Sequence, residues 1–155
     1  MKLFHVSPIN HPIGTVLQPG KYGSHVKSAR TRMTTVDAGF ALTILAWEGP
    51  LEIYRRLAVP KAPSRLDCLY ATSTLAEAQR FRQRYRANAD VFEIDVADHV
   101  PTHIADFEAI SSVPTGKPMI DGFVDGSAAY WTPSVEATLR EVLVGGPARV
   151  IAKIP

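Results

Sequence analysis

A histidine, a tyrosine and a glutamate, each within or at the end of a predicted strand, are the side chains in this sequence best suited to chemistry. They are His5, Tyr70 and Glu141. An imidazole can donate or accept a hydrogen bond, and a phenol offers an aromatic face. A carboxylate can stabilise positive charge that develops beside it. The three can act together only if strands far apart in the sequence bring them to one place.

Each of the three also has a purely structural interpretation, and the sequence leaves both open. A strand histidine near the start of a chain is often a surface residue, and this interpretation stands beside the functional one for His5. Tyr70 can be a core residue whose hydroxyl finds a nearby partner. Glu141 can be an edge-strand charge that discourages aggregation.

Other chemistries fit the sequence less well. His99 and His103 are four residues apart, but Pro101 between them interrupts any helical face that would hold a metal ion. Cys68 lies in an apolar run, which predicts a buried thiol and not a nucleophile. The glycine pair in 145–147 does not precede a predicted helix, so it does not match a phosphate-binding loop. We therefore expect no metal site.

A short strand followed by a capped helix positions the tyrosine. The strand ends at Tyr70, and Thr74 followed three residues later by Glu77 matches a capping box at a helix start. Apolar residues then recur at helical spacing at 78, 81 and 85. The hydroxyls of Thr72 and Ser73 lie between strand and helix, which is where we expect a ligand to bind.

The rest of the pattern predicts an α+β fold in a single domain over residues 1–155. We expect helices at 37–47 and 51–58, separated by Gly49-Pro50, and a turn of helix around 104–110. We expect strands at 3–7, 91–96 and 129–131, and a terminal hairpin of 141–144 with 148–154. Residues 8 to about 35 are rich in proline, glycine and basic side chains. They predict a loop that is mobile from Gly20 onward.

Composition sets broad limits on the class of protein. Hydrophobic residues make up 46% and charged residues 21%, as in ordinary folded domains. No apolar run approaches the roughly 20 residues of a membrane span, and the first residues do not look like a signal peptide. We therefore expect a cytoplasmic, bacterial-type protein with no membrane association.

Charge is distributed unevenly along the chain. Residues 1–36 carry five basic side chains and no acidic one, although the net charge is only +2. Such a stretch suits an anionic ligand, for example a pyrophosphate or a nucleic-acid backbone. It is equally consistent with a basic half that faces the acidic residues 87–139 across the fold.

Three separated blocks resemble the histidine-type branch of the ADP-ribosyltransferase superfamily, as in rifampin ADP-ribosyltransferases. The blocks are Leu3-Phe4-His5-Val6-Ser7 with residues 14–20, Leu69-Tyr70-Ala71-Thr72-Ser73-Thr74 leading into Ala78 and Phe81, and Arg140-Glu141-Val142-Leu143-Val144. A closer resemblance covers nearly the whole chain. It is to the bacterial domain of unknown function 2441 family, in residues 47–48, 63–69, 130–131 and 141–144.

The resemblance implies two small antiparallel sheets around an NAD cleft, with helices on the flanks and NAD as a substrate. It implies that Glu141 lies beside the nicotinamide ribose, that Tyr70 stacks on the nicotinamide, and that His5 contacts the adenosine-side ribose. The further NAD-binding residues that we expect are Ser7, Arg65, Thr72 and Ser73, with Arg65 or a basic residue of the first loop on the pyrophosphate.

The expected activity is therefore cleavage of the nicotinamide–ribose bond and transfer of ADP-ribose to an acceptor. Arginine-modifying members of the superfamily carry an acidic residue two positions before the catalytic glutamate, where this chain has Leu139. Arginine is thus not the expected acceptor, which leaves a small molecule, a nucleic acid or another protein side chain. One alternative is a non-catalytic member of the fold that binds a nucleotide or a protein. The other is an NAD glycohydrolase, in which water is the acceptor.

The NAD interpretation carries a geometric expectation. We expect His5 and Tyr70 on neighbouring strands of one sheet, with both side chains facing the same concave surface. Side chains on opposite faces would end the NAD interpretation.

Overall fold

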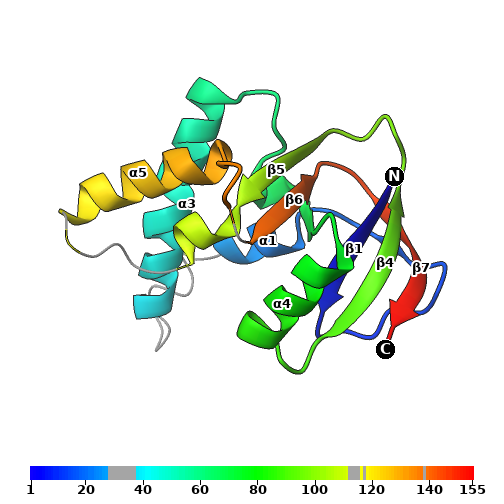
Figure 1. The fold of residues 1–155 in the computed structure, drawn as a ribbon. Helices are drawn as coiled ribbons and strands as arrows, with labels where there is room; N and C mark the ends of the chain where they lie inside the picture. Colours follow the sequence, from blue (N-terminus) through cyan, green and yellow to red (C-terminus); the bar gives the residue numbers. More distant parts are fainter. Residues whose placement is uncertain (28–37, 112–115, 117, 138) are drawn as a thin grey trace.

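The computed structural model describes residues 1–27, 38–111, 116, 118–137 and 139–155 (Figure 1). The described chain is a mixed α/β fold with two antiparallel sheets and four α-helices. The helices are α1 (Lys21–Lys27), α3 (Ala38–Ala58), α4 (Leu75–Tyr85) and α5 (Met119–Trp131), and two short 3-10 turns are η1 (Arg65–Asp67) and η2 (Phe107–Ile110).

The strands divide between the two sheets without following chain order. The four-stranded sheet has the order β1-β4-β7-β2, with β1 (Lys2–Ser7), β4 (Asp90–Val96), β7 (Ala148–Ile154) and β2 (Val16–Leu17). The three-stranded sheet has the order β3-β6-β5, with β3 (Leu69–Ala71), β6 (Arg140–Val144) and β5 (Thr102–Asp106). A single antiparallel bridge between Phe4 and Thr72 joins the sheets.

The two faces of the three-stranded sheet contribute to two different hydrophobic cores. Leu69, Ala71, Val142 and Val144 pack against the four-stranded sheet. The alternate residues, which include Leu143, face α3 and α5 and join a second core with Trp47 and Trp131. Because Tyr70 pairs with Leu143, and Glu141 is two residues before Leu143, both point toward this helix-covered side.

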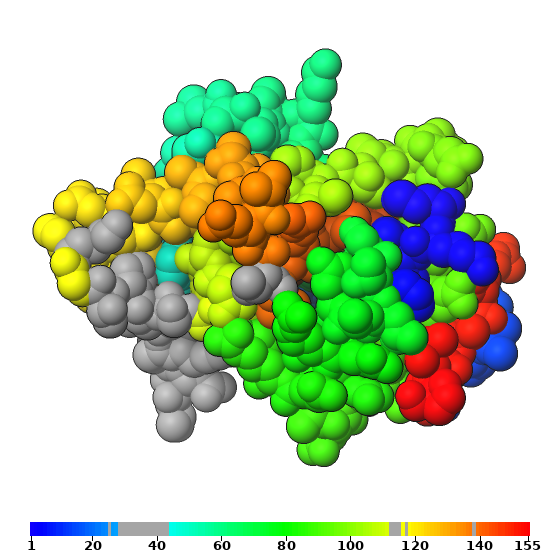
Figure 2. All heavy atoms as spheres, viewed as in Figure 1, coloured from blue at the N-terminus to red at the C-terminus, as the bar shows by residue number. Residues whose placement is uncertain are grey.

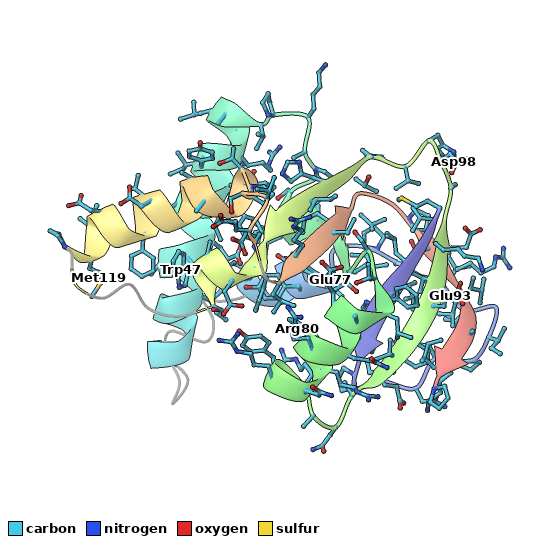
Figure 3. All side chains as sticks on the ribbon, in the orientation of Figure 1. Trp47, Glu77, Arg80, Glu93, Asp98 and Met119 are labelled. Atoms are coloured by element: carbon cyan, nitrogen blue, oxygen red, sulfur yellow. The ribbon has the colours of Figure 1, made fainter. Side chains whose placement is uncertain are left out.

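Helix α4 covers the outer side of the first sheet. It packs against β1 and β4, and Figure 3 shows Glu77 at its start and Arg80 one turn later. The predicted capping box is confirmed, because the Thr74 hydroxyl accepts from the Glu77 N–H and the Glu77 carboxylate accepts from the Thr74 N–H. Figure 2 shows α4 at the surface, next to the segment that follows α5. The predicted strands at 3–7 and 91–96 are also confirmed.

The predicted break at Gly49-Pro50 is wrong, since α3 continues through it to Ala58. Proline inside a helix loses one backbone hydrogen bond, and its ring also clashes with the Cβ of the residue before it. Glycine has no Cβ, so Gly49 removes this second part of the cost. Continuous burial of Trp47 and Leu51 against α5 then favours one long helix over two short ones.

Four further expectations are corrected. Residues 21–27 form α1 and not loop, and the rest of the predicted mobile loop, 28–35, lies outside the described residues. Residues 129–131 end helix α5, and residues 102–106 form a strand before η2. The terminal hairpin does not form. Residues 145–147 instead carry the chain from β6 in one sheet to β7 in the other.

No helix in the described part of the chain is long and apolar enough to cross a bilayer.

Helix α1 lies very close to η1, and this contact gives a stability prediction. A Cβ at Gly23 would lie 1.6 Å from the backbone oxygen of Leu66, and no side-chain rotation can relieve that overlap. We expect Gly23→Ala to lower the free energy of unfolding by about 1–3 kcal/mol, as overpacking does. Ser24→Ala, on the exposed side of the same helix, should change it by less than about 0.5 kcal/mol. Thermal unfolding of both variants tests the contact, and equal melting temperatures would contradict it.

Candidate functional site

A buried arginine links two buried glutamates beneath the three-stranded sheet. The Arg65 Nε donates to both carboxylate oxygens of Glu48, at 3.1 and 3.2 Å. Its Nη1 donates to Oε1 of Glu141 at 2.5 Å and to the Tyr130 hydroxyl at 2.5 Å. The Tyr130 hydroxyl in turn donates to the same Oε1 of Glu141. All three charged residues are at most 7% exposed.

Three tyrosine rings surround the guanidinium. Its central carbon lies 4.8 Å from the ring centroid of Tyr130, 5.1 Å from that of Tyr70 and 5.9 Å from that of Tyr22. An arginine is weakly hydrated and interacts favourably with aromatic faces, so the rings compensate part of the desolvation. The Tyr22 hydroxyl donates to Glu48 at 2.8 Å, and the Tyr70 hydroxyl donates to the Arg65 carbonyl oxygen at 2.7 Å.

The cluster has an excess of negative charge when both carboxyls are ionised, because two carboxylates share one guanidinium. Burial raises the pKa of Glu141, and the attraction of Arg65 and the hydrogen bond from Tyr130 oppose that rise. A positively charged group beside Glu141 would relieve the excess. The electrostatics therefore suit a ligand on which positive charge is present or develops.

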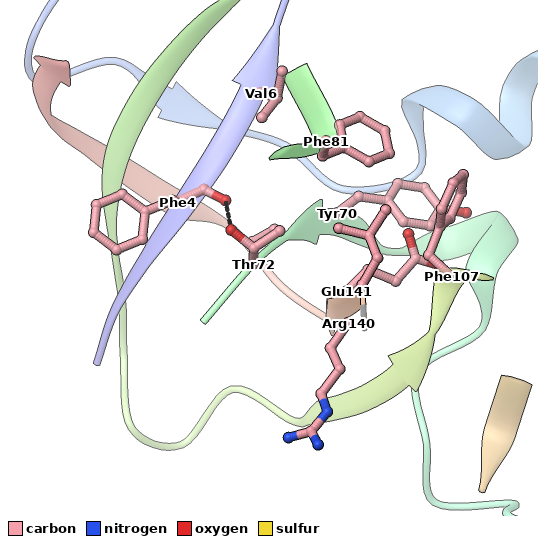
Figure 4. Close-up of a pocket in the computed structure, with 10 residues that line it drawn as sticks. Phe4, Val6, Tyr70, Thr72, Phe81, Phe107, Arg140 and Glu141 are labelled. Atoms are coloured by element: carbon pink, nitrogen blue, oxygen red, sulfur yellow. Dashed lines mark hydrogen bonds between the residues drawn. The ribbon is translucent and has the colours of Figure 1, made fainter. Parts of the chain in front are cut away.

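A shallow pocket opens beside the glutamate, with an empty volume of about 340 Å³ that includes space open to solvent (Figure 4). Its walls are Phe4, Val6, Tyr70, Ala71, Thr72, Phe81, Phe107, Leu139, Arg140 and Glu141. Figure 4 shows the rings of Tyr70, Phe81 and Phe107 near the Glu141 carboxylate, whereas the Arg140 guanidinium points away. The pocket is thus an aromatic space with one carboxylate in its wall.

Among the described residues, hydrogen-bond donors reach only one oxygen of that carboxylate. Every hydrogen bond to the Glu141 side chain from the described residues reaches Oε1, and none reaches Oε2. Since Glu141 lines the pocket, Oε2 is the atom left to act on a ligand there.

A backbone segment of β1 adds hydrogen-bonding groups to the pocket. Phe4 exchanges both of its backbone hydrogen bonds with Thr72, so its N–H and C=O point away from β4. In an antiparallel pair this direction alternates, and Val6 therefore presents its N–H and C=O on the same side as Phe4. No described residue bonds to these groups of Val6. They are a donor and an acceptor at the pocket wall.

The structure places His5 next to Tyr70 in space but outside the pocket. Its Nδ1 donates to the Tyr70 carbonyl oxygen at 2.7 Å, which fixes the proton on that nitrogen, and burial lowers its pKa. The prediction of one sheet and one shared surface is wrong. β1 and β3 belong to different sheets, and strand alternation sends His5 to the face opposite Phe4 and Val6, which line the pocket with Tyr70. Because the two residues belong to different sheets, they do not lie on opposite faces of one sheet. No pocket built on both side chains is supported, and direct ligand contact by His5 stays a prediction.

The remaining predicted residues fall into three settings. Thr72 lines the pocket, with its hydroxyl donating to the Thr74 carbonyl at 3.0 Å. Ser7 is buried, where its Oγ lies 3.0 Å from Nε2 of His11, and Ser73 is exposed. Arg65 is engaged by two carboxylates, so contact with a pyrophosphate, which stays a prediction, would require its guanidinium to leave both.

Sequence reasoning missed the partners that hold the glutamate. Tyr130 is fully buried, and its hydroxyl binds Arg65 and Glu141. Glu48 belongs to the resembling segment 47–48, which gave no sign that it would pair with Arg65. Cys68 is buried as expected, and burial raises the pKa of its thiol to about 12. Within the described ranges, no group of three histidine, cysteine, aspartate or glutamate side chains is arranged to hold a metal ion.

Removal of the Arg65 side chain should strongly destabilise the folded protein. Arg65→Met leaves two buried carboxylates without their cation, and we expect a loss of about 3–5 kcal/mol in the free energy of unfolding at neutral pH. Without Arg65, only the hydrogen bond from Tyr130 opposes the raised pKa of Glu141, and a group with a raised pKa in the folded state stabilises that state as the pH falls. The loss should therefore shrink in acid. Urea unfolding at pH 5 and pH 7.5 measures it.

The matched control is Arg56→Met, because Arg56 is 71% exposed and pairs with Glu52 at the surface. Its loss should stay below about 1 kcal/mol and should not share the pH trend. Equal effects of the two substitutions would show that the buried cluster contributes no special stability.

Comparison with known proteins shows which family this chain belongs to. No curated protein sequence matches this chain. Residues 21–155 match the family described as "Protein of unknown function (DUF2441)", which covers most of the sequence and includes Arg65, Tyr70, Tyr130 and Glu141. The chain belongs to this DUF2441 family.

Proposed function

We propose that this protein is an ADP-ribosyltransferase-like enzyme that uses NAD as a substrate, with the two sheets forming an ADP-ribosyltransferase-like fold. One observation carries the proposal: Glu141 lines an aromatic pocket, and among the described residues Arg65 and Tyr130 both bond to its Oε1 while none bonds to Oε2. A fixed carboxylate beside an aromatic pocket is what cleavage of a cationic ring from a sugar requires.

The pocket suits the nicotinamide ring. Tyr70 and Phe81 offer aromatic faces from a strand and from a helix, and a flat cationic ring gains from contact with them. The backbone N–H and C=O of Val6 match the oxygen and nitrogen of a carboxamide. This arrangement would place the attached ribose toward Glu141.

The reaction breaks the bond between the nicotinamide nitrogen and the ribose carbon. The nitrogen keeps the electron pair and leaves as neutral nicotinamide, and the ribose becomes an oxocarbenium-like cation. Glu141 stabilises that cation, and the excess negative charge shared with Glu48 strengthens the effect. The acceptor then bonds to the ribose carbon and loses a proton. Leu139 is buried at the pocket, where arginine-modifying members of the superfamily carry an acidic residue, so we propose an acceptor other than arginine.

One observation favours a second candidate, a non-catalytic nucleotide- or protein-binding member of the fold. Glu141 is only 6% exposed and already has a cationic partner, as expected of a residue whose role is structural. The two candidates differ in nicotinamide release, which only the enzyme performs. If water is the acceptor, the other product is free ADP-ribose, and the protein is an NAD glycohydrolase.

The first test is Glu141→Gln, which keeps the shape but removes the charge. We expect nicotinamide release to slow by about two to three orders of magnitude, because one electrostatic contact to the transition state is lost. The affinity for NAD should change little, since the ground-state ribose lacks the full charge. Nicotinamide release, NAD binding and melting temperature are measured on both proteins. A variant as fast as the wild type would remove Glu141 from the mechanism.

The pH dependence gives a second test. The reaction needs the ionised carboxylate, and burial raises the pKa of Glu141. We therefore expect kcat to fall in acid with a midpoint above about 4.3, the ordinary value for glutamate. The residual activity of Glu141→Gln should lack this acid limb. If it keeps the limb, another group is responsible for it.

A further inference from the structure

We infer that Arg65 and Tyr130 are the positioning residues for Glu141: together they fix Oε1 and thereby turn Oε2 into the pocket. This inference rests on the proposed function and extends it to residues that do not themselves line the pocket. Arg65 comes from η1 and Tyr130 from α5, so the carboxylate on β6 is held by two elements outside its own sheet.

The geometry allows little freedom. The two donors converge on a single oxygen of Glu141, and Arg65 Nη1 also donates to the Tyr130 hydroxyl. The three groups therefore form a closed triangle of hydrogen bonds. A carboxylate held at one oxygen by two donors keeps its other oxygen in a fixed direction. The carboxylate is thus preorganised before any ligand binds.

The arginine itself cannot drift toward the pocket. Its Nε donates to Glu48 on α3, the rings of Tyr22, Tyr70 and Tyr130 surround its guanidinium, and its carbonyl oxygen accepts from the Tyr70 hydroxyl. Lysine in its place would keep the charge but lacks the planar fork that reaches two carboxylates at once. The specific contribution of Arg65 is thus its shape as well as its charge.

This role has a signature that a merely structural role lacks. Loss of the hydrogen bond from Tyr130 weakens the preference for the ionised carboxylate, so the pKa of Glu141 should rise further. The acid limb of kcat should move to higher pH, while KM for NAD changes little, because the pocket walls are untouched.

The experiment compares wild type, Tyr130→Phe, Arg65→Lys and a matched control, Tyr54→Phe. Tyr54 lies on α3 beside the helical core and away from the pocket. Each protein is assayed for kcat and KM of nicotinamide release across pH and for thermal unfolding. The Glu141 carboxyl is titrated by carbon-13 NMR, with Glu141→Gln used to assign its signal.

We expect Tyr130→Phe to lower kcat by about 10- to 100-fold, the loss of one hydrogen bond to a charged group, with KM within about twofold. Arg65→Lys should lower kcat further, and Tyr54→Phe should match the wild type. The NMR titration should show a higher pKa for Glu141 in Tyr130→Phe.

Two results overturn the inference. One is Tyr130→Phe with the kcat, pH profile and Glu141 titration of the wild type. The other is a fall in kcat that only follows the folded fraction, with an unchanged titration. A wild type that binds NAD but releases no nicotinamide refutes the proposed function instead, and the titration then still decides whether Tyr130 and Arg65 hold the carboxylate.

Discussion

The arrangement depends on one guanidinium that serves two carboxylates. Arg65 joins α3, α5 and β6 through Glu48, Tyr130 and Glu141, so three elements share one buried polar centre. Buried charges are expensive unless they are paired and hydrogen-bonded. The described structure meets that requirement with five hydrogen bonds and with tyrosine rings on the open sides.

The sheet supplies the other constraint. Alternation along β3 and β6 gives one face to the contact with the four-stranded sheet and the other to the helices. Tyr70 and Glu141 share the helical face, which is why a ring and a carboxylate come together at the pocket. The side chain of His5 lies on the other face of β1 from Phe4 and Val6, so it does not join them. It donates a hydrogen bond to the Tyr70 carbonyl oxygen instead.

What could be predicted from the sequence was local. The capping box of Thr74 and Glu77 joins residues three apart, and the strand at 91–96 shows its own alternation, so both were found. The polar centre could not be found in this way, because Arg65 and Glu141 are 76 positions apart and neither carries a local signature of the other. The resemblance pointed to Tyr70 and Glu141, but it gave no hint that Arg65 would hold the glutamate.

The errors in secondary structure have a common cause as well. A Gly-Pro pair predicts a break, and the aromatic pair Tyr130-Trp131 predicts a strand, when only neighbours are considered. Burial of Trp47 and Leu51 against α5 overrides the first, and the packing of Tyr130 and Trp131 in the same core overrides the second. Tertiary contacts decided both segments.

The crossing of residues 145–147 between the sheets has a consequence for synthesis. In the described structure β3 pairs with β6, and Thr72 just after β3 bridges to β1, so residues 69–71 leave the ribosome some 70 positions before their partner strand exists. The nascent chain can fold α3 and α4 early, but it lacks Glu141 and the floor of the pocket. The pocket beside Glu141 is thus incomplete until residues 140–144 have emerged, and the same contact order predicts slow closure of the final sheet.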